Sequence, residues 1–184
     1  NMDLWNSKQT ADRWRVFRLS NLSHNTLVID GQLQLAKGKA KVVSFREGPE
    51  SETVLDLTAV YTNATQVIRT GTLLATGEYR LTDTLKGLKP GAMVRWGMVT
   101  RSTPDAQRNG TLLLREADKQ LWLSPLHNPD TAWKTFEVAK TPNEWDSPNT
   151  GMVMVGFEAA APASGELALV VLFTPGGLKR SFSR

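Results

Sequence analysis

The sequence predicts an all-β fold, an antiparallel two-sheet β-sandwich of the super-sandwich kind with about a dozen strands. Apolar and polar residues alternate with a period of two along most of the chain, as they do in strands that bury one face. Turn-forming residues separate these stretches at hairpin spacing, and Asn109-Gly110 and Ala117-Asp118 are the clearest hairpin turns. Helical periodicity is nearly absent, and a short helical turn is predicted only within Asp3–Asp12. Strands in this number suffice for two extended sheets packed face to face.

The predicted strands are rich in β-branched, aromatic and aliphatic residues, and most are bounded by Gly, Pro, Asn or Asp. The first, Trp14–Leu19, alternates its side chains across the strand, and the second, Thr26–Asp30, is an apolar run closed by Gly31. The strands that follow in the first half are Ala40–Arg46, Thr53–Tyr61, Gln66–Ala75, Glu78–Leu85 and Met93–Arg101. Those in the second half are Thr111–Glu116, Gln120–Ser124, Trp133–Val138, Gly151–Ala159 and Leu167–Thr174.

Length and composition indicate one globular domain. The 184 residues are enough for a single packed unit, and neither a linker nor an internal repeat divides them, so we expect residues 1–184 to form one domain. Lys140–Thr150, rich in Pro, Asn and Ser, is predicted to be a long loop within it. Cysteine is absent, which excludes disulfides and cysteine-based zinc sites. No apolar run approaches the roughly 20 residues of a membrane helix, so no membrane partner is expected.

The charge balance is mildly positive, +4 from 22 basic and 18 acidic residues. Such a balance suits an acidic polysaccharide or a phosphate backbone as a partner. Nucleic acid is not expected, because neither a recognition-helix pattern nor an aromatic RNA-binding motif is present. The basic residues form small groups, Lys37-Lys39-Lys41, Arg95/Arg101 and Lys179-Arg180, which are predicted to be solvated faces.

Few residues have the spacing of a catalytic or metal site. The chain has two histidines, too few for a histidine zinc site, and it lacks a nucleophile elbow and a phosphate-binding glycine loop. His24 follows a polar turn and precedes an apolar strand, a position suited to binding a metal or an acidic ligand. The alternative is that backbone hydrogen bonds hold it. Trp145, in a polar loop, is expected to be exposed, and His127, in a turn, to be solvated.

A family resemblance adds to these patterns. The stretch 13–31, RWRVFRLSNLSHNTLVIDG, resembles the HNTL signature of the C-terminal β-domain in heparinase II/III-type polysaccharide lyases. Further segments similar to that domain follow in the same order: Val54–Tyr61, Gln66–Arg69, Tyr79–Asp83 and Val94–Trp96.

The resemblance implies a lyase that cleaves uronic-acid polymers by β-elimination, with most catalytic groups on a helical α/α-toroid. Nothing in this chain corresponds to the toroid, so it looks like the C-terminal part of a longer lyase, inactive alone, with no catalytic residue assigned. It would form one wall of the substrate cleft and bind an acidic polysaccharide, with the toroid as partner domain. The implied substrate-binding residues are Arg18, His24 and Asn25, with Arg15 or Arg46 as further candidates, and Trp145 is added to them for its place in an exposed polar loop. The implied location is the bacterial periplasm or cell surface.

In several relatives of that family the β-domain holds a structural zinc. By resemblance, His24 corresponds to the first ligand and Asp56 to the second, but no histidine is present around Trp96–Val99, where the third is expected. His127 could take that place only if its loop folded back. The zinc site therefore looks incomplete, and no cofactor is assigned. The alternative function is a carbohydrate-binding or purely structural β-module, which would use exposed aromatics such as Trp145 and would bind neutral glycans as readily as acidic ones.

Overall fold

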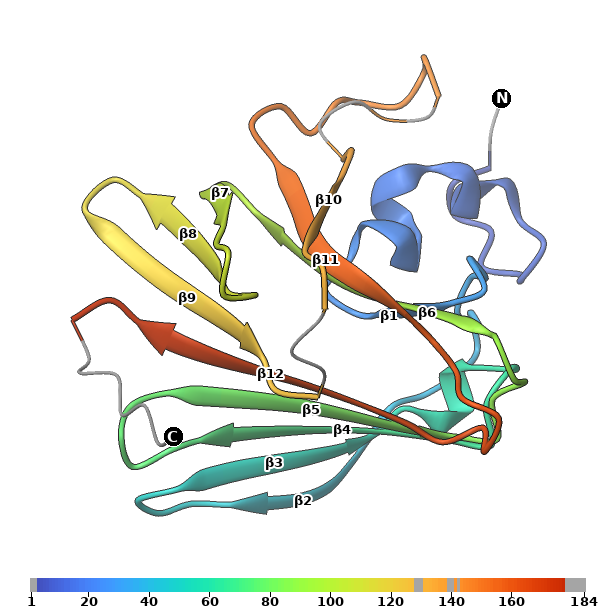
Figure 1. Cartoon of the computed structure of the whole chain (residues 1–184). Helices are drawn as coiled ribbons and strands as arrows, with labels where there is room; N and C mark the ends of the chain where they lie inside the picture. Colours follow the sequence, from blue (N-terminus) through green and yellow to red (C-terminus); the bar gives the residue numbers. More distant parts are fainter. Residues whose placement is uncertain (1–2, 128–130, 139–140, 142, 178–184) are drawn as a thin grey trace.

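The computed structural model, which describes residues 3–127, 131–138, 141 and 143–177, confirms the all-β prediction (Figure 1). Its strands form two antiparallel sheets. The smaller sheet has the order β1-β6-β11-β10, with β1 Leu27–Ile29, β6 Met93–Thr100, β11 Val153–Ala160 and β10 Lys134–Phe136. The larger sheet has the order β2-β3-β4-β5-β12-β9-β8-β7. Its strands are β2 Lys41–Arg46, β3 Ser51–Asp56, β4 Gln66–Leu73, β5 Tyr79–Lys86, β12 Leu167–Pro175, β9 Lys119–Pro125, β8 Leu112–Glu116 and β7 Thr103–Ala106.

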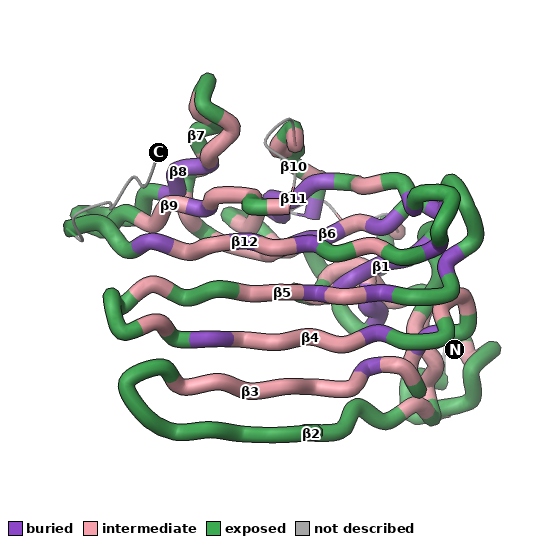
Figure 2. The backbone as a smooth tube through the Cα atoms, turned by 60° about the horizontal axis from the view of Figure 1, so that its bottom comes forward, coloured by how far each residue is buried: buried purple, intermediate pink, exposed green. Residues whose placement is uncertain are grey.

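The hydrophobic core lies between the two sheets. Alternate residues of each strand point inward, as the pleat requires, so β6 contributes Val94 and Trp96 and β11 contributes Val155 and Phe157. The rings of Trp96 and Phe157 stack with their centroids 5.5 Å apart. The larger sheet extends beyond the smaller one, and its edge strand β2 is exposed along its whole length (Figure 2).

Both predicted hairpins are present at the other end of the larger sheet. Ala117, with φ of 50°, and Asp118 join β8 to β9 in register, with Glu116 opposite Lys119. The turn at Asn109-Gly110 joins β8 to β7, a strand that the sequence analysis missed. The second residue of β7 is Pro104, and proline is found in strands mainly at the edge of a sheet. The structure fits this rule, because β7 is an edge strand.

The strand predicted at Trp14–Leu19 is wrong. This segment forms two 3₁₀ helices, η1 Asp12–Arg15 and η2 Phe17–Leu19, and a third, η3 Asn21–Ser23, follows. Its backbone groups bond locally; for example, Val16 N–H donates to Arg13 O and Ser20 N–H to Phe17 O. The apolar pairs 14/16 and 17/19 fit a period of two, whereas 14/17 and 16/19 fit a period of three, so the pattern alone could not separate the two structures.

The predicted strand Thr53–Tyr61 is too long. β3 ends at Asp56, whose Oδ1 accepts a hydrogen bond from Thr58 N–H at 2.8 Å and turns the chain into a fourth 3₁₀ helix, η4 Thr58–Val60. In the described part of the chain, no helix is long and apolar enough to span a membrane.

The N-terminal 3₁₀ helices form an additional layer over the smaller sheet (Figure 1). Val28 and Met154 are buried although they are not part of the core between the sheets. The layer is fixed to β6 by two contacts: Arg95 Nη2 donates to Leu22 O at 2.8 Å, and Val99 N–H donates to Asn25 Oδ1 at 2.7 Å. The HNTL segment follows this layer directly, from His24 to Leu27, the first residue of β1.

Candidate functional site

Two neighbouring pockets lie where the 3₁₀ layer meets the segment between β10 and β11. The smaller pocket, about 170 Å³, is lined by Arg18, His24, Val99, Val138, Asn149 and Met152. The larger, about 290 Å³, is lined by Leu4, Val16, Arg18, Trp145, Asp146 and Ser147. Arg18 borders both pockets, so it lies between His24 on one side and Trp145 on the other. The structure therefore groups three of the four residues predicted to bind substrate.

The two walls of this site are distant in sequence and are joined by two hydrogen bonds, one of them part-buried. Phe17 N–H donates to Asp146 Oδ2 at 2.6 Å, and Asn143 Nδ2 donates to Arg15 O at 2.9 Å. Asp146 is only 7% exposed. Asn149 Nδ2 donates to Val138 O at 2.9 Å and closes the far wall. The sequence analysis identified this region only as a polar loop, and no local pattern showed that its Asp and Asn side chains are partners of the 3₁₀ layer.

The guanidinium of Arg18 is available for a ligand. Arg18 is exposed, and its guanidinium has no hydrogen-bond or ion-pair partner among the described residues. An unpaired guanidinium at a pocket rim can bind a carboxylate or sulfate through two parallel N–H···O bonds.

His24 is exposed and held by one backbone contact. Its Nε2 lies 3.1 Å from the carbonyl oxygen of Arg18. Because a carbonyl oxygen only accepts hydrogen bonds, Nε2 carries the proton in this contact. In the neutral imidazole Nδ1 then bears the lone pair. Both expectations for His24 are thus compatible with its position: the backbone orients the ring, and the ring still borders the smaller pocket.

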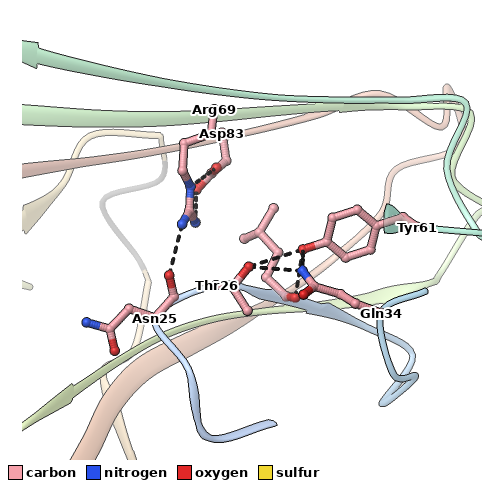
Figure 3. A network of polar contacts seen from close by, with 7 residues as sticks. Asn25, Thr26, Gln34, Tyr61, Arg69 and Asp83 are labelled. Carbon is pink, nitrogen blue, oxygen red and sulfur yellow. Dashed lines mark hydrogen bonds and ion pairs between the residues drawn. The ribbon is translucent and has the colours of Figure 1, made fainter. Parts of the chain in front are cut away.

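Asn25 fixes the segment that carries His24. Its Oδ1 accepts from Val99 N–H, and its carbonyl oxygen accepts from Arg69 Nη1 at 3.0 Å (Figure 3). Both oxygen atoms of Asn25 thus accept hydrogen bonds within the protein, so Nδ2 is the group that could donate to a ligand. Substrate binding by Asn25 stays a prediction.

A polar network behind the site anchors this segment to the larger sheet (Figure 3). Arg69 donates to both carboxylate oxygens of Asp83, from Nε at 2.7 Å and from Nη2 at 2.9 Å. Asp83 is fully buried, and burial raises the pKa of its carboxyl, an effect that Arg69 opposes. The segment Tyr79–Asp83 belonged to the family resemblance, but nothing in the sequence showed that its aspartate pairs with Arg69.

The same network includes Tyr61, whose hydroxyl donates to Leu27 O at 2.9 Å and accepts from Gln34 Nε2 at 2.8 Å. Burial raises the pKa of this hydroxyl above its ordinary value, so it stays protonated at neutral pH. Thr26 Oγ1 lies 3.3 Å from the same oxygen. The contacts drawn in Figure 3 thus stabilise the position of β1 and of the residues before it.

Trp145 is 49% exposed, as the sequence analysis expected. The guanidinium carbon of Arg15 lies over its ring, 5.9 Å from the centroid. Arg46, the second arginine considered, lies on β2 at the far edge of the larger sheet and pairs with Glu52 at 3.9 Å, so it does not belong to this site.

Asp56 contributes to neither pocket. Its carboxylate is used in the turn before η4, where hydrogen bonds from Thr58 lower its pKa. Across residues 3–127, 131–138, 141 and 143–177, no group of three or more His, Cys, Asp and Glu side chains lies close enough to hold a metal ion. A tetrahedral zinc site takes four ligands, so the donors present do not fit one, and the pairing of His24 with Asp56 stays a prediction.

His127 is half-buried instead of solvated. Val170 N–H donates to its Nδ1 at 3.2 Å, Nε2 contacts Thr131 Oγ1 at 3.2 Å, and the ring lies 4.9 Å from that of Phe157. It therefore belongs to the packing of β9 against β12 and not to a site.

Comparisons with known proteins agree with this fold. A family model described as "Heparinase II/III-like, C-terminal" matches residues 4–158. The heparan sulfate lyase HepC from Pedobacter heparinus is similar over 85% of this chain and 25% of its own, with a TM-score of 0.68 and 17% identity. The heparinase III BT4657 gene product is similar over 86% and 24%, with a TM-score of 0.65 and 14% identity.

A further heparinase III structure is similar over 82% of this chain and 23% of its own, with a TM-score of 0.61 and 15% identity. At these identities the likeness shows the fold, and this chain spans about a quarter of each of the three lyases. A sequence search among curated proteins gave no match.

Proposed function

Because the chain belongs to the heparinase II/III-like C-terminal domain family, we propose that it is the C-terminal β-sandwich of a polysaccharide lyase acting on acidic, uronic-acid-containing glycans. In this proposal the domain forms one wall of the substrate cleft, opposite a helical α/α-toroid, and has no activity alone. The proposed location is the bacterial periplasm or cell surface.

The proposed reaction is β-elimination at a uronic-acid residue. A base removes the proton on C5, the electron pair forms the C4–C5 double bond, and the bond from C4 to the glycosidic oxygen breaks. The leaving oxygen takes a proton from an acid. Negative charge builds on the carboxylate next to C5 before the bond breaks, so a cation beside it lowers the barrier. We assign the base and acid to the toroid and the binding of anionic groups to this domain.

One observation carries the proposal: the guanidinium of Arg18, which has no partner among the described residues, borders two pockets on the 3₁₀ layer that precedes the HNTL segment. Its fork of N–H donors matches a carboxylate or a sulfate. Trp145 offers an apolar ring face beside it, suited to the C–H face of a sugar. His24, oriented by the Arg18 carbonyl, presents Nδ1 to a hydroxyl or an N–H group of the glycan.

Calorimetric titration of the 184-residue chain with heparin, alginate, chondroitin sulfate and a neutral glucan tests this function. We expect binding to at least one acidic polymer, weakened as salt rises from low to moderate concentration, and no binding to the glucan. Arg18→Gln should weaken the acidic interaction. The matched control is Arg108→Gln, since Arg108 is also exposed and has no ion pair among the described residues.

Equal binding of the neutral glucan would favour a general carbohydrate-binding module over the lyase assignment. Loss of affinity to the same extent in both arginine variants would show a non-specific charge effect and would contradict the assigned site.

A further inference from the structure

A third pocket lies beside η4, at the loop that leads into β2, and the family resemblance assigns no role to it. It has a volume of about 650 Å³, and its lining includes Lys8, Lys37, Lys39, Lys41, Leu35 and Ala59. The sequence analysis interpreted three of these lysines as a solvated face. The structure adds a fourth, Lys8, from the N-terminal segment, and places all four around one concave surface.

The four ammonium groups have no close anionic partner. Among the described residues, ion pairs involve Lys86, Lys119 and Lys134, and none involves a lysine of this pocket. Asp56 lies opposite Lys41 across the β2–β3 pairing and interacts with it electrostatically. Four lysines and no aspartate or glutamate are among the described residues that line the pocket, so its lining is positively charged.

The backbone of the pocket is held in place by specific contacts. Gln9 donates from Nε2 to Gln34 O at 3.2 Å and accepts from Ala36 N–H at 2.7 Å, so the N-terminal segment is tied to the loop. Leu35 N–H donates to Val60 O at 2.9 Å. Gly38 packs on η4 so closely that a Cβ there would lie 2.5 Å from the carbonyl oxygen of Ala59. Only glycine fits at position 38, and these contacts hold the backbone that carries the four lysines in place.

The chemistry of the pocket specifies its ligand. The floor is apolar, from Leu35, Ala59 and the lysine methylenes, and the rim is cationic. A sugar ring bearing carboxylate or sulfate groups matches both parts, because its C–H face packs on the floor while its anionic groups reach the ammonium groups. We propose that this lysine pocket (Lys8, Lys37, Lys39 and Lys41) is a second binding subsite for an anionic sugar of the same glycan, an inference that rests on the proposed function.

The two sites are close enough for one chain to occupy both. Leu4 lines the pocket that contains Trp145, and Lys8 lines the lysine pocket. Four residues of extended chain span at most about 14 Å, so the Cα atoms of Leu4 and Lys8 are no farther apart than this. The N-terminal segment thus lines both pockets, and in this proposal one oligosaccharide follows it from Arg18 to the lysine pocket.

The test is calorimetric titration of the 184-residue chain with heparin and alginate hexasaccharides. The double variant Lys37→Glu/Lys39→Glu should bind the better of the two roughly five-fold or more weakly, with a smaller salt dependence. The control is Lys89→Glu/Arg108→Glu, the same charge change at exposed positions without ion pairs in the described chain, and it should bind nearly as the unmodified protein does. Ala59→Trp, which fills the pocket without changing the charge, should also weaken binding.

Three results would overturn the proposal that the lysine pocket binds the glycan. They are no binding of either hexasaccharide, unchanged binding in the lysine and Ala59 variants, or an equal loss of binding in the Lys89→Glu/Arg108→Glu control. Binding of a single-stranded oligonucleotide that equals hexasaccharide binding and is lost in the same variants would assign the pocket to nucleic acid instead. Arg18→Gln separates the two proposals. Weakening by Arg18→Gln alone supports the first site and refutes the second, and weakening by the lysine variant alone does the reverse.

Discussion

Asp146 and Phe17, 129 positions apart in the chain, are joined by a hydrogen bond of 2.6 Å from the backbone N–H of Phe17 to Asp146 Oδ2. The contact joins the 3₁₀ layer, which carries Arg18 and His24, to the segment that carries Trp145. Because Asp146 is almost fully buried, we assign its carboxylate to stabilising the site and not to binding a ligand. The shape of the candidate site depends on it.

Asp146→Ala should therefore lower the free energy of unfolding by about 1–2 kcal/mol, because it leaves the part-buried N–H of Phe17 without this partner. It should also weaken glycan binding, because the two walls are no longer held together. Urea unfolding and calorimetry measure the two effects. Unchanged glycan affinity in a folded Asp146→Ala protein would contradict the role of this tie.

Arg18→Lys distinguishes paired guanidinium binding from simple charge attraction. Lysine keeps the positive charge but cannot form two parallel hydrogen bonds with a carboxylate or sulfate. We expect Arg18→Gln to lower glycan affinity roughly five- to ten-fold and Arg18→Lys to restore only part of the loss. Full restoration by lysine, measured by the same titration, would show that the geometry of the guanidinium is not used.

His24→Ala should reduce turnover of the full-length lyase more than it reduces stability. The imidazole is exposed and makes one contact, at 3.1 Å, to a backbone carbonyl, so its removal should cost less than about 1 kcal/mol of unfolding free energy. Turnover on an acidic glycan and thermal unfolding are measured on the same preparation. A large loss of stability with unchanged turnover would assign His24 to structure alone.

Arg69→Met should destabilise the domain by about 3–5 kcal/mol, because it leaves the fully buried carboxylate of Asp83 without its cation. The double variant Arg69→Met/Asp83→Leu should recover much of this loss, since it removes the unpaired charge as well. Chemical denaturation of the three proteins gives the comparison. A double variant as unstable as Arg69→Met would show that the loss comes from packing and not from charge.

The stability of Arg69→Met should also depend on pH. Burial raises the pKa of Asp83, and Arg69 opposes that rise, so removing Arg69 raises the pKa further. Above the ordinary value of 3.8, the unfolded chain has lost a proton that the folded variant keeps. The free energy of unfolding is then highest below pH 3.8 and falls as the pH rises through the folded-state pKa. A pH-independent difference from the unmodified protein would contradict this.

Alternation and turn residues predicted the fold, because each strand buries one face and each hairpin needs its own turn chemistry. Ala117-Asp118 is such a case, where two residues define the register of β8 and β9. The same rule failed at Trp14–Leu19, because a six-residue stretch with apolar side chains at 14, 16, 17 and 19 fits either period. The structure decides between them, because the backbone groups of this segment bond locally in 3₁₀ turns.

The candidate site could be predicted only in part. Arg18, His24 and Trp145 came from motif and loop character, and the structure brings them to adjoining pockets. Asp146 and Asn149, which shape those pockets, form contacts that no local pattern encodes. The lysine pocket is a similar case, because the approach of Gly38 to η4 and the arrival of Lys8 from the N-terminal segment are tertiary features.

The most direct measurement of where an acidic glycan binds is an NMR titration of the 184-residue chain with a uronic-acid oligosaccharide. We predict that amide shifts concentrate in residues 15–25 and 143–152, around Arg18, and extend to the lysine pocket. Shifts confined to other surfaces, such as the β7–β8 hairpin, or no shifts at concentrations where the full-length lyase is saturated, would contradict the assignment of this face to the substrate.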